Sequence, residues 1–272
     1  MILYSSGGLH LFCKSAIKGN KYLSSFYWDK NVEKIKQAYE VSGEKMFLDS
    51  GGYTARVQGK PIDIKTYCDF VEKYQHLFHI CANLDIGTHE QQIANQKLLE
   101  SRVKIPVLPV FHPEEYFDKK KREWFDVEMQ KRDIVAIGGL VGGSGINYVD
   151  ELGDKGYFDW IFHRALKYKT KVHGFGITTV PTLIKYPFYS VDSSTWLAGA
   201  RFGTLFYWNP VKMKFDSTST KKVVKSKMVK NVSEIKLIEK DNVAILKNNL
   251  KAMYDMEKFI TSLWAKRGIK WD

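Results

Sequence analysis

Short apolar segments, each ending in or followed by Gly, Ser, Asp or Pro, recur along the chain with helix-like stretches between them. Continuous apolar segments bounded by turn residues are typical of strands that are buried on both faces of a parallel sheet. The expected strands are Ile2–Ser6, Lys45–Ser50, His79–Gly87, Ile105–His112, Asp133–Leu140, Lys171–Thr178 and Phe188–Ser193. The expected helices are Asn31–Val41, Ile64–Leu77, His89–Ser101, Pro113–Arg132 and Tyr157–Lys169. This alternation predicts an α/β fold of the TIM-like (β/α)8 barrel type.

The number of expected strands leaves one position of the barrel unassigned. Seven strands are clear, and the eighth is expected at Phe202–Trp208 or is missing, in which case the barrel is incomplete. A doubly wound open sheet is the alternative fold. In either fold, polar residues at the carboxyl ends of the strands form the active site.

The chain changes character after residue 210. The segment Val211–Lys240 contains nine lysines against three acidic residues, in a chain whose formal net charge is +12. The following stretch, Asp241–Ala265, has apolar residues at helical spacing, so we expect an amphipathic helix there. We therefore predict a catalytic (β/α) barrel at residues 1–210, and a basic segment with a C-terminal helix packed on the barrel at residues 211–272.

The basic charge favours a polyanionic partner, because lysine and arginine side chains that bind phosphates release condensed counterions. The cysteines Cys13, Cys68 and Cys81 show neither disulfide nor zinc-site spacing, which indicates a reducing compartment and no metal. No signal peptide or long apolar stretch is recognisable. We expect a cytoplasmic protein with no cofactor and no membrane partner.

Two strand ends carry an aspartate. Asp49 is followed by Ser50-Gly51-Gly52-Tyr53, which places a carboxylate beside glycines whose bare backbone can approach a ligand closely. The alternative is a helix-capping Asp-Ser pair followed by a glycine turn. Asp85 follows the next apolar segment, where a buried carboxylate can accept hydrogen bonds from the N1–H and the exocyclic amine of a guanine-like base. The alternative for Asp85 is an N-cap of the helix that follows.

Two later strand ends complete the set. Gly138 and Gly139, with two more glycines close behind, offer backbone N–H and C=O groups to a flat ligand, or form a flexible turn. Asp192 ends a strand among hydroxyl residues that can orient it, and the alternative is a structural role for this side chain. Three aspartates at one barrel mouth indicate retaining glycosyl transfer, in which one carboxylate attacks the anomeric carbon and another shuttles a proton. Two histidines at strand ends, His112 and His173, are further candidates for lining the pocket.

Taken together, these elements resemble the tRNA-guanine transglycosylase family. The matching elements follow the family's order over roughly residues 45–200: Asp49-Ser50-Gly51-Gly52-Tyr53, Asp85, Ile137-Gly138-Gly139-Leu140, Gly174-Phe175-Gly176 and Val191-Asp192-Ser193. The resemblance implies that Asp192 is the nucleophile and that Asp49 binds the base and acts as general acid and base. It implies that the base is bound by Ser50, Gly51, Tyr53, Asp85, Gly138, Gly139, His173 and Gly174.

Several features depart from the family. The zinc site is absent, since no cysteine follows Cys81, and Val110-Phe111-His112-Pro113 replaces a glutamine-glycine element. His173 stands where the family has an apolar stacking residue. A short, zinc-free chain of this kind resembles the phage and bacterial DpdA branch, which places 7-deazaguanine derivatives into DNA; in a virus it would act in the host cytoplasm.

Three functional hypotheses follow. The first is a DNA transglycosylase that exchanges guanine for a 7-deazaguanine such as preQ0. The second is a tRNA-guanine transglycosylase, and the third is a non-catalytic nucleic-acid-binding barrel. In each of them the lysine-rich segment is expected to contact phosphates, and the residues chosen for that role are Lys221, Lys222, Lys225 and Lys227. The sequence is compatible with a homodimer.

Overall fold

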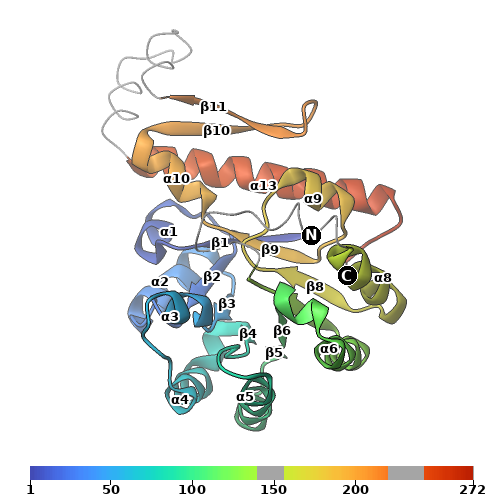
Figure 1. Cartoon of the computed structure of the whole chain (residues 1–272). Coiled ribbons are helices and arrows are strands. Elements are labelled where there is room, and N and C mark those ends of the chain that lie inside the picture. The colour runs from blue at the N-terminus through green and yellow to red at the C-terminus, as the bar shows by residue number, and fades with distance from the viewer. Residues whose placement is uncertain (140–155, 220–241, 272) are drawn as a thin grey trace, which may run out of the picture.

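The computed structural model describes residues 1–139, 156–219 and 242–271. Its centre is a parallel sheet with the strand order β5-β4-β3-β2-β1-β9-β8-β7-β6 (Figure 1). The strands are β1 (Ile2–Ser6), β2 (Tyr22–Ser25), β3 (Met46–Asp49), β4 (Phe78–Ala82), β5 (Val107–Leu108), β6 (Val110–Phe111), β7 (Ile134–Ile137), β8 (Lys171–Gly174) and β9 (Ser190–Ser193). The first strand pairs with the last, from Ile2 opposite Ser190 to Ser5 opposite Ser193. The fold is therefore a nearly closed TIM-like α/β barrel, as predicted.

Strands β5 and β6 are two parts of one segment, which Pro109 interrupts. Proline has no N–H group to donate to a neighbouring strand. Before the interruption, the Leu108 carbonyl accepts a hydrogen bond of 2.9 Å from the Asn83 N–H on the β4 side. After it, the Phe111 carbonyl accepts one of 3.0 Å from the Gly138 N–H on the β7 side. A single segment thus changes partners along its length, and the one seam of the barrel that strand pairing leaves open lies between β5 and β6.

The prediction that Phe202–Trp208 completes the barrel is wrong. Strand β10 (Thr204–Asn209) pairs antiparallel with β11 (Lys214–Ser219) in a separate two-stranded sheet. This hairpin packs against the C-terminal helix on the side away from the barrel (Figure 1). The missing barrel strand is β2, whose four residues Tyr-Leu-Ser-Ser are too few and too polar to stand out in the sequence.

Helices follow the strands and cover the outside of the barrel (Figure 1). They are α1 (Leu9–Ser15), α2 (Val32–Ser42), α3 (Gly52–Val57), α4 (Ile64–Tyr74), η1 (Gln75–Leu77), α5 (His89–Arg102), η2 (Pro113–Phe117), α6 (Lys119–Lys131), α8 (Tyr157–Tyr168), α9 (Val180–Lys185), α10 (Thr195–Phe202) and α13 (Asn242–Lys266). Asn31, Asp63 and Thr88 begin α2, α4 and α5, and each side chain accepts a hydrogen bond from the N–H three residues further on. These caps set where the helices start, and therefore how long the strand-end loops are.

The C-terminal helix α13 lies along β1 and is part of the outer layer. The Met1 ammonium donates a 3.1 Å hydrogen bond to Thr261 Oγ1, and the Tyr254 and Ser5 hydroxyl oxygens lie 3.2 Å apart. Its buried face includes Leu246, Leu250, Met253, Met256 and Ile260. The domain boundary at residue 210 stays a prediction. No helix within the described ranges is both long and apolar enough to cross a membrane.

The apolar core consists of two clusters. The larger one fills the space between the strands and the helices. The smaller one fills the inside of the barrel and consists of Tyr4, Leu23, Phe47, Ile80, Ala82, Leu108, Val110 and Ala136. Because side chains plug the barrel, its interior cannot hold a ligand, and the carboxyl-end mouth is where a barrel of this kind builds its active site.

Candidate active site

The mouth of the barrel contains a cavity of about 190 Å³. Asp49 at the end of β3, Asp85 after β4 and Asp192 in β9 all lie in its wall. The remaining lining residues are Leu23, Tyr53, Thr54, Val110, His112, Gly138, Gly139, Phe175 and Gly176. The three aspartates named from the sequence therefore converge on one cavity, because the carboxyl ends of parallel strands meet at one face of a barrel.

Asp49 combines burial with like-charged neighbours. Burial, followed by the negative charges of Asp85 and Asp192, raises the pKa of Asp49 to about 7. The backbone N–H groups of Gly51 and Ser50 oppose this shift, and Gly51 N donates to Asp49 Oδ2 at 3.1 Å. A carboxyl group with a pKa close to neutrality can both give and accept a proton, as a general acid and base must. The bond from Gly51 forms a local turn just before α3, whose N-cap residue is Gly51.

Asp192 is held in place from one side only. Its Oδ1 accepts a 2.8 Å hydrogen bond from the Gly176 N–H, and His173 Nε2 lies 3.8 Å from the same oxygen. Its Oδ2 has no hydrogen-bond partner among the residues that the structure describes. The carboxylate is therefore oriented by one oxygen, and the other oxygen remains available in a residue that lines the cavity.

Asp85 forms a short pair with His112. The His112 Nε2 and Asp85 Oδ2 atoms lie 2.6 Å apart, and Ser50 Oγ donates a longer bond of 3.5 Å to Asp85 Oδ1. Burial alone would lower the pKa of His112, but the hydrogen bond to Asp85 and its charge outweigh burial and raise that pKa. Asp85 does not cap α5, since Thr88 does. The pair fixes the position of the Asp85 carboxylate, which is part of the cavity wall.

The His112 backbone and the Asp85 loop are fixed from behind. Glu115 Oε2 accepts a 2.9 Å hydrogen bond from the His112 N–H, and the Glu115 side chain is buried. Asn95 Nδ2 donates to the Leu84 carbonyl at 2.9 Å. The His112 backbone is therefore anchored to η2, and the loop that carries Asp85 is anchored to α5. These contacts limit how far Asp85 can move when a ligand binds.

At two positions beside the Asp85–His112 pair, neighbouring atoms lie so close to the backbone that only glycine fits. A Cβ atom on Gly52 would lie 2.6 Å from Asp85 Oδ1. A Cβ atom on Gly139 would lie 2.6 Å from His112 Nδ1, and Gly139 has a φ of 67° that side chains rarely adopt. Gly52 and Gly139 therefore leave space for the Asp85–His112 pair as well as for a ligand.

Other sequence-predicted residues lie elsewhere. Ser50 is buried and supports Asp85, and Gly51 packs against Tyr27. His173 has no exposed surface and lies beneath Phe175, with the two ring centres 4.5 Å apart, while Gly174 packs against Phe188. His173 and Gly174 are therefore not on the cavity wall. Tyr53 is on the wall, with 39% of its side chain exposed.

The lysines assigned to phosphate binding, Lys221, Lys222, Lys225 and Lys227, lie outside the described residues. The glycines behind Gly139, at positions 142 and 143, also lie outside them. Among the residues described, no group of three His, Cys, Asp or Glu side chains is arranged to hold a metal ion.

A larger hollow of about 830 Å³ adjoins the cavity and shares Leu23, Asp49, Tyr53, Thr54 and Asp192 with it. Its own wall comes mainly from the loops after β1 and β2 and from the start of α10, and includes Gly7, Gly8, His10, Trp28, Asp29, Lys34 and Leu197. Sequence reasoning missed this region because it missed β2. The one signal in the sequence is the aromatic-acidic turn Phe-Tyr-Trp-Asp directly after that strand.

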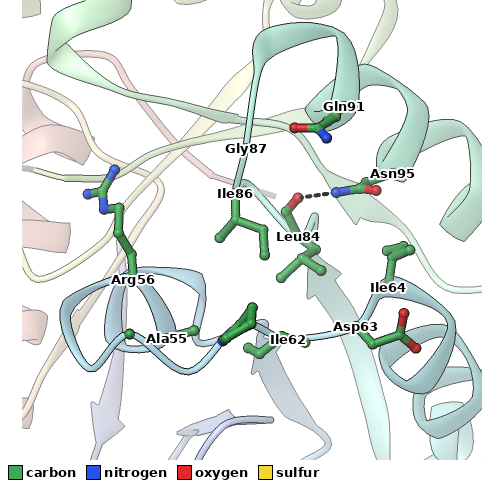
Figure 2. A pocket seen from close by; sticks show the side chains of 12 residues that line it. Ala55, Arg56, Ile62, Asp63, Ile64, Leu84, Ile86, Gly87, Gln91 and Asn95 are labelled. Atoms are coloured by element: carbon green, nitrogen blue, oxygen red, sulfur yellow. Dashed lines mark hydrogen bonds between the residues drawn. The ribbon is translucent and has the colours of Figure 1, made fainter.

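A third cavity, of about 580 Å³, lies behind the Asp85 loop between α3, α4 and α5 (Figure 2). Ile62, Leu84 and Ile86 point into it, and Arg56 stands at its edge. Its one acidic residue, Asp63, already caps α4. The Arg56 guanidinium lies 5.8 Å from the centre of the Tyr53 ring, which links this cavity to the wall of the active site.

Comparison of the sequence with protein-family models and with curated proteins finds no match. The function is therefore proposed from the chemistry of the site together with the resemblance described above.

Proposed function

We propose that this protein is a pentosyltransferase that exchanges guanine in DNA for a 7-deazaguanine derivative such as preQ0, through a covalent aspartyl-glycosyl intermediate. The observation that carries the proposal is Asp49. Its pKa of about 7 and its place beside Asp192 in one small cavity suit a proton shuttle paired with a nucleophile.

The reaction takes place in two displacements at the sugar C1′ atom. In the first, a carboxylate oxygen of Asp192 forms a bond to C1′ as the bond from C1′ to guanine N9 breaks, and Asp49 gives its proton to the leaving base. In the second, the incoming base gives a proton to Asp49 as its nitrogen attacks C1′, and the Asp192 carboxylate leaves. Atoms and charge balance, and each carboxyl group returns to its starting state.

The inner cavity is small enough to favour a single base. Its volume of about 190 Å³ lies below the roughly 300–1,000 Å³ of pockets for drug-sized ligands. Asp85 offers an acceptor oxygen to the N–H groups of a guanine-like edge, and Gly138 and Gly139 offer a wall without side chains. Phe175 and Tyr53 supply aromatic surface in the same wall. These features support a flat base that carries hydrogen-bond donors.

The net charge of +12 supports a nucleic acid as the partner. Guanine within a duplex is stacked, so the enzyme must flip the target nucleotide or act on an opened strand, at a cost of a few kcal/mol. The DNA substrate is favoured over tRNA by the same sequence argument as before, namely the missing zinc site. A barrel that binds nucleic acid without turnover fits poorly with three retained carboxylates in one cavity.

Release of labelled guanine tests the proposal. The protein is incubated with preQ0 and with duplex DNA, single-stranded DNA or tRNA, each carrying radiolabelled guanine, and free label is counted. We expect release from DNA that requires the incoming base. Release from tRNA alone would establish the second hypothesis, and no release from any of them would leave only the non-catalytic one.

A further inference from the structure

Trp28 lines the outer hollow, and the residue is 62% exposed. The other six tryptophans also lie within the described ranges, and each of them is buried or half-buried. Large aromatic side chains are normally placed where they exclude water from a core or an interface. The Trp28 indole is exposed beside a cavity that adjoins the candidate catalytic residues. It is therefore available to pack against a molecule bound there.

A rigid turn presents the Trp28 ring. The Trp28 N–H donates to the Ser25 carbonyl at 3.1 Å, and Asp29 Oδ2 accepts from the Ser25 N–H at the same distance. The ring packs against Tyr27, with centres 5.0 Å apart and planes at 77°. The Tyr27 hydroxyl donates to Gln58 Oε1 at 2.8 Å, which ties the turn to the residues after α3. The indole is thus held in place while most of its surface faces solvent.

The path of a bound strand follows from the two connected spaces. If a base fills the inner cavity, its sugar lies at Asp192, which is part of both walls. The outer hollow adjoins this position and offers a path for the rest of the nucleic-acid chain, whereas side chains plug the barrel interior below. The next nucleotide therefore lies in the hollow that Trp28 lines.

We propose that Trp28 is a stacking platform for the base next to the target nucleotide, in a DNA strand that is single-stranded at that point. This inference rests on the proposed function, because that function places a nucleotide sugar at Asp192. Aromatic side chains stack on nucleobases irrespective of sequence, since every base has a π-face. The site would therefore hold the opened strand without selecting its sequence.

The remaining wall of the hollow includes groups that can contact a sugar-phosphate backbone. Lys34 on α2 and His10 on α1 are its basic residues, and Asp29, Asp49 and Asp192 are its acidic residues. Gly7 and Gly8 contribute backbone without side chains, and Cβ atoms there would lie 3.1 and 3.0 Å from Leu197. Asp29, the further acidic residue of the hollow, has Oδ2 engaged by Ser24 Oγ and the Ser25 N–H within the turn.

Equilibrium binding to short oligonucleotides tests the inference without requiring turnover. Fluorescence anisotropy is measured for a labelled single-stranded DNA, the same sequence as a blunt duplex, and the same sequence as RNA. The variants are Trp28→Ala, Trp28→Phe and, as a control, Tyr39→Ala, which removes an aromatic ring that is 40% exposed on α2 and lines neither space. Far-UV circular dichroism confirms that each variant is folded.

We expect Trp28→Ala to raise the Kd for single-stranded DNA by about 5- to 150-fold, the factor for losing one base–aromatic stack. Trp28→Phe should recover most of the affinity, and Tyr39→Ala should match the wild-type protein. The duplex should be affected much less, because its bases are stacked on each other.

Three results would overturn the platform: an unchanged Kd for single-stranded DNA, an equal loss on the duplex, or a loss confined to RNA. The proposed function fails separately. If the Trp28 variants behave as expected but the wild-type protein releases no guanine from DNA, the platform is supported and the base exchange is not.

Discussion

Among the residues that the structure describes, two carboxyl groups have a pKa raised to about 7, and the charges around these two groups are opposite in sign. Asp49 lies in the cavity, where burial and then the charges of Asp85 and Asp192 raise its pKa. Glu257 lies on α13 behind β1, where burial raises the pKa but the Leu3 N–H, the chain's terminal ammonium and Lys21 act against it. Burial can raise a carboxyl pKa anywhere in a fold. Like charges gathered around an open cavity are what mark a candidate catalytic acid.

The largest effect is expected for Asp192→Ala. Without this carboxylate no ester to C1′ can form, so base exchange and covalent trapping of DNA should both be abolished. Denaturing gel electrophoresis of protein mixed with labelled DNA measures the trapping. Trapping at the wild-type level would show that Asp192 is not the nucleophile. The raised pKa of Asp49 would then not mark a site in which Asp192 reacts.

The next largest effect is expected for Asp49→Asn. Its amide cannot transfer the proton, so the exchange rate should fall by about two to four orders of magnitude. In the wild-type protein the protonated acid is lost as pH rises through about 7, so leaving-group protonation should weaken above that pH. A pH profile of kcat for both proteins measures this. Near-normal rates would mean that Asp49 is only a turn residue.

Asp85→Asn should alter His112 directly. Burial lowers the pKa of His112 and Asp85 raises it, so removing the carboxylate charge leaves burial less opposed and the pKa should fall. NMR titration of the His112 imidazole measures the change, and exposed His163 serves as the control in the same spectra. The KM for the incoming base should rise by about tenfold to a hundredfold, as for the loss of a charged hydrogen bond. A His112 pKa that does not move would show that the pair is not formed in solution.

The lysine-rich segment Val211–Lys240 is expected to contribute to DNA binding and not to base exchange. We expect Lys221→Ala combined with Lys222→Ala to weaken DNA binding evenly across sequences, and to flatten the log–log salt dependence by roughly two for two lost phosphate contacts. Base choice should stay the same, since Asp85, Gly138 and Gly139 are untouched. Binding measured over a series of salt concentrations decides the matter, and an unaltered slope would place the phosphate contacts elsewhere.

The smallest effect on activity is expected for Glu257→Gln. A carboxyl with a raised folded pKa contributes stability that is present below its unfolded pKa of about 4.5 and is lost as pH rises through about 7. Because glutamine does not ionise, the stability of the variant relative to the wild-type protein should rise by about 2 to 3 kcal/mol of unfolding free energy between pH 5 and pH 8. Urea unfolding at the two pH values measures this. A loss of base exchange in this variant would contradict the view that Glu257, unlike Asp49, has a raised pKa without a role in the reaction.

Much of the site could be predicted because its residues are adjacent to strands that the sequence makes visible. Asp49, Asp85 and Asp192 each follow a buried apolar run, and a barrel brings such ends together. Gly138 and Gly139 were found in the same way. A contact between residues that are far apart in the chain produces no local sequence pattern. The Asp85–His112 contact therefore could not be predicted, although each residue was a candidate for the pocket.

The failures have local physical causes. Strand β2 contains buried Ser24 beside Ser25, so it does not form a continuous apolar run, and with it the Trp28 turn was missed. His173 was placed in the pocket because it is close to a strand end. Alternate residues of a strand point into the barrel, so His173 and Phe175 share a side, and Phe175 at the mouth covers His173 below.

The strand order divides the candidate machinery between distant parts of the chain. Asp49 and Asp85 belong to the first five strands, while His112, Gly139 and Asp192 follow Pro109. Neither half of the polypeptide holds both proposed partners of the glycosyl transfer, and the pairing of Ile2 with Ser190 is needed to bring them together. Such long-range closure is slow relative to local helix formation. During refolding, the circular dichroism signal of the helices should therefore return ahead of activity. The rate at which activity recovers would then report how fast β1 pairs with β9.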